Sequence, residues 1–155
     1  MHKIRLWKIW SLVVAGLLLS FGGSGAHASR FEVVGDYVIH YNALNTTILS
    51  PKMAQNYNIT RSKNRALLTI AVRKKAAEGE MLDQAVSATV KAGVVNLSEQ
   101  YSAVEMREIR EPAAIYYIGV FTINNAETLD LTLEVTPEGE GEPHIFKFRQ
   151  EFFTD

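Results

Sequence analysis

The chain of 155 residues contains no cysteine. No disulfide can therefore stabilise the fold, and thiol catalysis, cysteine-ligated zinc and lipid attachment through cysteine are all excluded. Histidine is scarce, with four residues, and there is no HExxH motif, P-loop, G-x-S-x-G elbow or G-x-G-x-x-G fingerprint. These absences remove the usual signatures of metal, nucleotide and nucleophile chemistry, so we expect no cofactor and no catalytic activity.

The sequence has only one long apolar run, and it lies near the N-terminus. Three basic residues precede the apolar stretch Ile9–Phe21, and small residues follow it up to Ala28. This order is typical of a secretory signal peptide that is cleaved after Ala28. An uncleaved membrane anchor is the alternative, but such a short helix would reach only about 20 Å, less than the roughly 30 Å of a bilayer core. We predict a signal peptide at residues 1–28 and a single domain at 29–155.

The charge of the predicted mature chain is nearly balanced. Residues 29–155 retain 13 Lys and Arg against 17 Asp and Glu, a formal charge of −4. Such a chain has no electrostatic reason to bind nucleic acid. No second apolar run is long enough to span a membrane. We therefore expect a soluble periplasmic protein that is not a lipoprotein, and the sequence leaves its oligomeric state open.

Apolar and polar residues alternate from Tyr37 onward, which indicates β-strands. The clearest strands are Leu129–Val135 and Phe146–Phe152, joined by a Gly/Pro-rich loop at 136–143. Ile115–Ile123 is apolar on both faces, as expected for a central strand. The other predicted strands are Phe31–Ala43, interrupted or bent at Gly35-Asp36, then Ala66–Val72, Ala85–Val94 and Tyr101–Arg110, the last with a β-bulge near Arg107-Glu108.

About seven short strands, with no internal repeat and no sustained amphipathic helix, predict an all-β fold. A chain of this length favours an immunoglobulin-like antiparallel β-sandwich. A small β-barrel is the alternative, and for residues 85–94 a helical stripe also fits the apolar spacing. Neither architecture specifies a function.

The alternation is interrupted between Tyr41 and Arg65. Ser50 is suited to cap a helix and Pro51 to begin it, so we predict a short helix over Pro51–Tyr57. Asn58 is suited to the left-handed conformation that ends a helix. We expect this helix to lie in a crossover between the two sheets.

The polar residues around this helix are candidates for binding. In an extended segment Arg61, Lys63 and Arg65 would share one side and face a carboxylate, a phosphate or an acidic partner. A solvated strand edge is the alternative. The upstream candidates are Tyr41, Asn42, Asn45 and Thr46, for which hydrogen bonding to loop backbone is the alternative role.

Tyr116 is a further candidate because it neighbours Tyr117 on opposite faces of the predicted central strand. One of the two rings is therefore expected to line a sheet surface that is open to a partner.

Metal binding is not expected. Glu138, Glu140 and Glu142 offer hard oxygen ligands for weak calcium binding, but their spacing is not that of a calcium loop, and a solvated hairpin tip is the simpler interpretation. His40 and His144 are not spaced as a metal pair.

The segments YNALNTTILSP, from Tyr41, and YNITRSKNRALLTIAV, from Tyr57, resemble a family of exported bacterial proteins known as domain of unknown function 4426. The resemblance extends over most of the predicted mature chain. It implies a small periplasmic β domain without an assigned activity, and it supplies no catalytic residues.

Three functional hypotheses follow. The leading one is a non-enzymatic periplasmic module that binds a protein or peptide partner in the cell envelope. The second is a small-molecule binding protein with a pocket near residues 41–65. The third is an uncharacterised hydrolase that uses His40 or His144.

Overall fold

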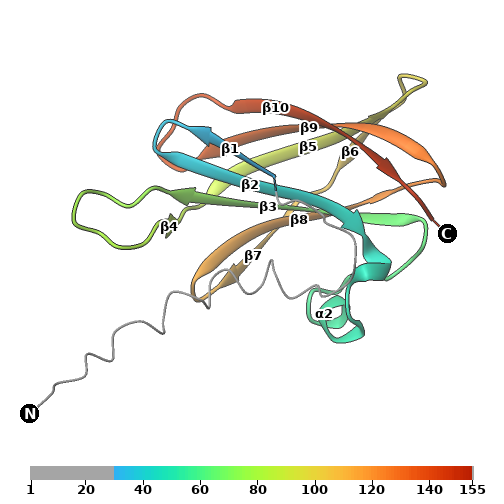
Figure 1. Cartoon of the computed structure of the whole chain (residues 1–155), viewed down its shortest axis with the longest axis horizontal. Helices are drawn as coiled ribbons and strands as arrows, with labels where there is room; N and C mark the ends of the chain where they lie inside the picture. Colours follow the sequence, from blue (N-terminus) through green and yellow to red (C-terminus); the bar gives the residue numbers. More distant parts are fainter. Residues whose placement is uncertain (1–29, 155) are drawn as a thin grey trace, which may run out of the picture.

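The computed structural model describes residues 30–154, which form two antiparallel β-sheets packed face to face (Figure 1). The predicted signal peptide lies outside the described residues. The larger sheet contains, in spatial order, β1 (Arg30–Val34), β2 (Tyr37–Asn45), β3 (Arg65–Lys74), β8 (Ala114–Thr122) and β7 (Arg107–Glu111), and the short β4 (Gln84–Ala85) pairs with the end of β3. The smaller sheet contains β10 (His144–Phe152), β9 (Glu127–Pro137), β5 (Ala88–Asn96) and β6 (Tyr101–Val104). The predicted β-sandwich is confirmed, and the described strands do not close into one barrel.

The core lies between the sheets and is built from the inward-facing half of each alternating strand. Ile39, Leu68, Ile70 and Val72 of the larger sheet and Leu131, Leu133 and Val135 of the smaller sheet have no exposed surface. Burial of each such side chain contributes about 1.5–3 kcal/mol relative to leaving it in water. A continuous apolar layer of this kind explains how the domain folds without disulfides.

The predicted N-terminal strand is interrupted at Gly35-Asp36 and not merely bent there. Residues 30–45 form two strands, β1 and β2, which pair antiparallel, a pairing that was not predicted. The turn between them contains Gly35 with φ of +53°. This left-handed conformation is one that glycine adopts at no steric cost, so the chain reverses there.

Residues 101–111 also differ from the prediction, because they contain a change of sheet and not a β-bulge. β6 belongs to the smaller sheet and β7 to the larger sheet, and Glu105-Met106 connect them. The phase change of the apolar residues, which predicted an extra residue within one strand, marks this passage between sheets. The β1–β2 hairpin, the change of sheet and the two-residue β4 account for the ten described strands where about seven were predicted.

The helix is present as predicted, with a small difference at its end. α2 (Pro51–Asn56) begins with Pro51, and the Ser50 Oγ accepts a hydrogen bond from the Met53 N–H at 3.2 Å. Asn58 ends the helix with φ of +50°. The helix follows a 3-10 turn, η1 (Thr46–Ile48).

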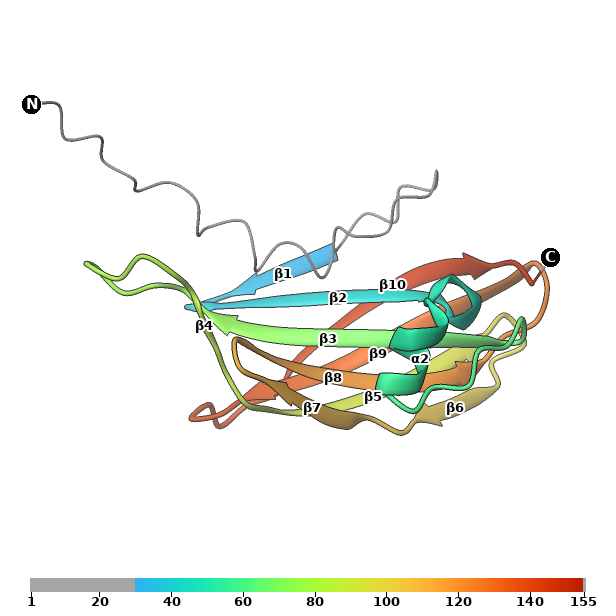
Figure 2. The ribbon, with the colours of Figure 1, turned by 90° about the horizontal axis from the view of Figure 1, so that it is seen from below.

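The predicted crossover is wrong, because α2 lies in the connection between β2 and β3, which are neighbouring strands of the larger sheet. α2 lies against the outer face of the larger sheet, over β3 and β8 (Figure 2). The helix packs on the sheet through a second apolar cluster, whose buried members are Leu44, Leu49, Ala54, Ile59, Leu67 and Ile118. α2 and the residues that flank it therefore cover one end of that face and leave the remainder without a covering element from residues 30–154.

Candidate binding site

The outer faces of the two sheets differ in chemistry. On the smaller sheet, Lys91 pairs with Glu134 at 2.8 Å and Arg149 pairs with Asp130 at 2.7 Å. The hydrogen bonds from Arg149 lower the pKa of the Asp130 carboxyl. These cross-strand pairs are exposed and satisfy one another, as is typical of a solvated sheet face.

The outer face of the larger sheet carries rings in place of ion pairs. The strand register aligns Phe31, His40, Ala71, Tyr116 and Ile109 in a row across five strands. Ala71, with a single methyl group, lies between the His40 and Tyr116 side chains. His40, Ala71 and Tyr116 are half-buried, whereas Phe31 is 59% exposed. The row thus presents two polar aromatic groups on either side of a small residue.

Arg73 lies two residues beyond Ala71 on the same face of β3. It donates a hydrogen bond to the carbonyl oxygen of Asp83. Burial lowers the pKa of His40, the charge of Arg73 lowers it further, and Asp83 partly opposes the effect. Burial and then Glu111 raise the pKa of Tyr116, and Arg73 opposes that rise. Arg73 is therefore electrostatically coupled to both aromatic groups of the row.

The helix side of this face is closed by a contact between α2 and β7. The Tyr57 O–H donates a hydrogen bond to a carboxylate oxygen of Glu111, and this bond is the largest reason that the pKa of Tyr57 rises to about 12. Arg107 donates to the carbonyl oxygen of Tyr57. The carboxylate of Glu111 is thus engaged within the protein.

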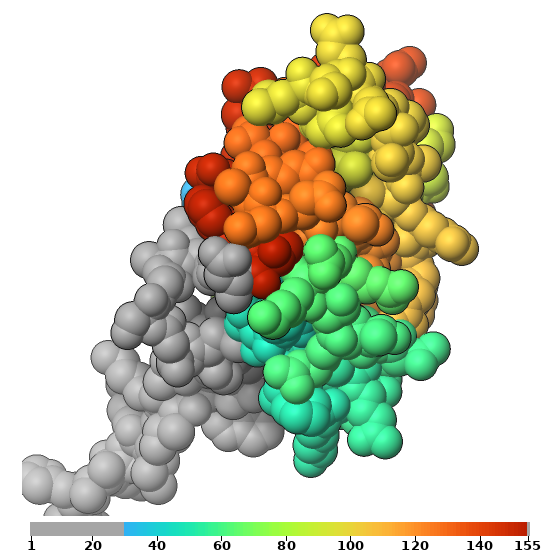
Figure 3. Space-filling model, turned by 90° about the vertical axis from the view of Figure 1, so that its right-hand side faces the viewer, coloured from blue at the N-terminus to red at the C-terminus, as the bar shows by residue number. Residues whose placement is uncertain are grey.

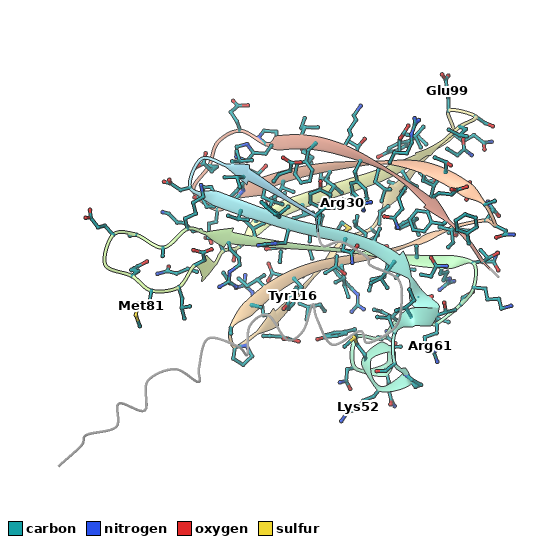
Figure 4. The ribbon with its side chains drawn as sticks, viewed as in Figure 1. Arg30, Lys52, Arg61, Met81, Glu99 and Tyr116 are labelled. Carbon is teal, nitrogen blue, oxygen red and sulfur yellow. The ribbon has the colours of Figure 1, made fainter. Side chains whose placement is uncertain are left out.

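Beside Glu111 the face opens into a pocket of about 730 Å³. β8 pairs with β3 only as far as the Ala71–Tyr116 position, and β4 takes the place beside β3 at Arg73. The divergence leaves a space whose lining includes Arg73, Met81, Leu82, Glu111, Ala114 and Ile115. Met81 and Leu82 are 79% and 65% exposed, and Figure 4 shows Met81 on the protruding loop beyond β3.

The predicted basic row is not formed as one strand face. The Arg61 guanidinium donates to the Thr47 carbonyl at 2.8 Å, Lys63 lies in a turn, and Arg65 begins β3. All three side chains are exposed. They belong to the end of the molecule where the segment 57–65 lies beside the turn that follows β8 (Figure 3).

The upstream candidates mostly have structural contacts. Tyr41 is buried and packs against Phe146 and Phe148, with ring centroids 5.0 and 4.9 Å apart. Asn45 donates to the Phe153 carbonyl. The Thr46 hydroxyl, fully buried, donates to the Ser62 carbonyl at 3.0 Å and accepts from the Ser62 N–H at 2.9 Å.

Two of the predicted residues do lie on the outer face of the larger sheet. Tyr116 belongs to the row that runs from Phe31 to Ile109. Asn42 pairs with Thr69, and each lies two residues along its strand from a member of that row. Arg73 was not predicted as a site residue, and its proximity to Tyr116 depends on strand register, which the sequence does not specify.

The other predicted features are placed apart. His40 lies in the larger sheet and His144 in the smaller one. Glu138, Glu140 and Glu142 are exposed in the β9–β10 loop. Within residues 30–154 no group of three or more His, Cys, Asp or Glu residues is arranged to hold a metal ion.

A family model for domain of unknown function 4426 (DUF4426) matches residues 31–155. The chain belongs to this family. The crystal structure of a DUF4426 protein from Pseudomonas aeruginosa PAO1 is similar, with a TM-score of 0.70 and 29% identity over 84% of this chain and 99% of that one. No curated protein is similar enough in sequence to count as a match to this DUF4426 chain.

Two structures of FetP from uropathogenic Escherichia coli strain F11 share the fold of this DUF4426 protein. One is the protein as isolated after recombinant expression in the E. coli periplasm, with a TM-score of 0.55 and 10% identity over 81% of this chain and 94% of that one. The other is a copper-bound variant, with a TM-score of 0.58 and 8% identity over 81% of this chain and 95% of that one. Within the part of the chain that is described, no helix has the length and hydropathy needed to cross a membrane.

Proposed function

We propose that this protein is a non-enzymatic binding module of the periplasm, which binds a protein or peptide partner in the cell envelope through the outer face of its larger sheet. The observation that supports this proposal is the chemical difference between the outer faces of the two sheets. The smaller sheet presents charges that are paired with each other, whereas the larger sheet presents half-buried His40, Arg73 and Tyr116 beside an apolar-lipped pocket. Partly buried aromatic and arginine side chains are the types enriched in binding surfaces.

The location within the proposal rests on the N-terminal sequence. The N-terminal sequence has the order of a signal peptide. FetP, at 10% identity, shares the fold and does not bear on the location of this protein. Copper is left out of the proposal because a likeness at 8% identity shows the fold alone.

The space expected to hold a small molecule, between residues 41–46 and α2, is packed with side chains. Leu44, Leu49, Ala54 and Ile59 form part of one continuous buried cluster there. The geometry therefore supports the outer-face hypothesis over a pocket near residues 41–65.

A photo-crosslinking experiment in intact cells tests the proposal. p-Benzoylphenylalanine is placed at the position of Tyr116 in the full chain, and in a matched variant at the position of Tyr101, an exposed tyrosine on the outer face of the smaller sheet. We expect ultraviolet-dependent protein adducts with the probe at 116 and none at 101. Equal melting temperatures of the two variants serve as the folding control. Adducts at neither position, or equally at both, contradict the proposal.

A further inference from the structure

The outer face of the larger sheet carries a site formed by His40, Arg73 and Tyr116, whose side-chain N–H and O–H donors are not all used in hydrogen bonds within the protein. Within residues 30–154 the side chains of His40 and Tyr116 make no hydrogen bond to protein, and Arg73 donates only to the Asp83 carbonyl. No carboxylate of the described residues forms an ion pair with Arg73. Partly buried donors without acceptors, next to an arginine, are suited to a carboxylate ligand.

Two acidic residues at the border limit which anion fits. Glu111 already accepts a hydrogen bond from the Tyr57 hydroxyl, and Asp83 accepts one from the Ala76 N–H at 2.9 Å. Both carboxylates border the site, so a multiply charged anion such as phosphate would be repelled. A ligand with one negative charge placed directly on Arg73 fits the arrangement.

The pocket beside Arg73 defines the rest of the ligand. Arg73 itself lines the pocket, whose apolar wall includes Met81, Leu82, Ala114 and Ile115. A group held by Arg73 therefore lies at the same pocket as this apolar surface. The last residue of a polypeptide carries its carboxylate and its side chain on the same carbon atom, so it can contact both features at once. An internal Asp or Glu carries its carboxylate on its own side chain, so a different residue of the peptide would have to fill the pocket.

We propose that the outer face binds the C-terminus of a partner chain that ends in a large apolar residue, with the terminal carboxylate on Arg73 and Tyr116 and the last side chain in the pocket next to Ala114 and Ile115. This inference rests on the proposed function and specifies the partner's chemistry. It belongs to a known mode of recognition in which a domain binds a chain terminus through its carboxylate.

The test uses a synthetic array of pentapeptides, Gly-Ser-Gly followed by every combination of two residues, anchored by their N-termini with free carboxylates. A twin array carries C-terminal amides. The purified protein, labelled with a fluorophore, is expected to bind acids that end in Leu, Ile, Val, Phe or Met, and to lose this binding on the amide array. Binding that does not depend on the free carboxylate, or no binding to either array, overturns the inference.

Two variants locate the contact. Arg73→Gln is expected to bind the selected free-acid peptides about 10- to 100-fold more weakly, because a charge-assisted hydrogen bond is lost. Arg65→Gln removes an exposed arginine from the other end of the same strand and is expected to bind as the wild type does. Unchanged peptide affinity in Arg73→Gln overturns the inference.

A third arm separates a peptide from a small apolar acid. Octanoate is titrated against the protein and followed by melting temperature. If octanoate raises the melting temperature through Arg73 while no peptide binds, the ligand is a free acid and the inference is overturned. The photo-crosslinking result distinguishes the proposed function from C-terminal recognition. If adducts form at position 116 but no peptide on either array binds, the proposed function stands and C-terminal recognition is overturned.

Discussion

Gly119 lies on β8, where the connection between β6 and β7 passes from one sheet to the other. A Cβ atom at this position would lie 2.5 Å from the Met106 Sδ, 2.6 Å from the Val104 Cγ1 and 2.9 Å from the Glu105 carbonyl oxygen. Side chains can adjust, but the backbone oxygen belongs to the chain that crosses between the sheets. Glycine is therefore needed for this close approach.

Gly119→Ala is expected to lower the free energy of unfolding by about 1–3 kcal/mol, because the added methyl group overpacks the crossing. Urea denaturation measures the effect. Gly141→Ala is the control: a Cβ there meets no atom within 4 Å, so its stability should stay within about 0.5 kcal/mol of wild type. Equal stability of the two variants would contradict the role given to Gly119.

Thr46 supports the connection into β3 through its buried hydroxyl, which exchanges two hydrogen bonds with the Ser62 backbone. Thr46→Val keeps the shape but leaves the Ser62 N–H and carbonyl without these partners, which is expected to cost about 1–3 kcal/mol. Thermal or urea unfolding measures it. Thr47→Val, at an exposed position, should be close to neutral. A neutral Thr46→Val would contradict the stabilising role given to these two hydrogen bonds.

At the scale of single elements, α2 is two turns at most and depends on its first residues. Ser50→Ala removes the acceptor of the Met53 N–H and is expected to cost about 1 kcal/mol, whereas Ser50→Asp retains a capping oxygen and should restore most of the loss. The two variants are compared by urea unfolding. A loss of the same size in both would point to a contact other than the cap.

The sequence predicts most of the regular strands and the helix. It does not predict which strands pair with each other or where the chain passes from one sheet to the other. The alternation in 129–135 and 146–152 specifies strands because each buries one face, and the Ser50-Pro51 pair specifies a helix start because both residues favour it locally. The hairpin at Gly35 and the passage at Glu105-Met106 depend on which sheet each strand joins. Local periodicity carries no information about that choice, so a bend and a bulge were the nearest local interpretations.

At the scale of the whole molecule, stability should depend on pH through His40. Its pKa in the folded state lies below the ordinary value of 6.5, mainly because of burial and then because of Arg73. The unfolded state therefore binds the proton more readily than the folded state. We expect stability to be greatest above pH 6.5 and to fall as the pH drops below 6.5 toward the folded-state pKa.

Unfolding free energies of wild type and His40→Gln between pH 7.5 and 4.5, the range set by the titration of histidine, measure this term. The difference between the two proteins should change with pH in that range, with the variant gaining relative to wild type in acid. A difference that stays constant would show that His40 titrates equally in both states.

The candidate site shows the same limit as the fold. The sequence predicted Asn42 as a polar binding candidate and one of Tyr116 and Tyr117 as a ring on an open sheet surface. It did not predict that His40, Ala71 and Arg73 lie on the same face near Tyr116, because that depends on the order β2–β3–β8 and its register. The basic residues at 61–65 stood out in the sequence because they are close along the chain. Proximity along the chain is a weak guide in a sandwich whose surfaces are assembled from distant strands.

The two sheets are tied together unequally along their long sides. Along one side the polypeptide itself runs from β6 into β7, whereas along the other β1 and β10 are joined by side chains alone, through the Arg30–Gln150 hydrogen bond of 2.8 Å and the Arg30 guanidinium 5.0 Å from the Phe148 ring centroid. Transient separation of the two sheets should consequently begin along the side of Arg30, where the polypeptide chain does not connect them. The amide protons of β1 and β10 should therefore exchange with solvent before those of β3 and β8.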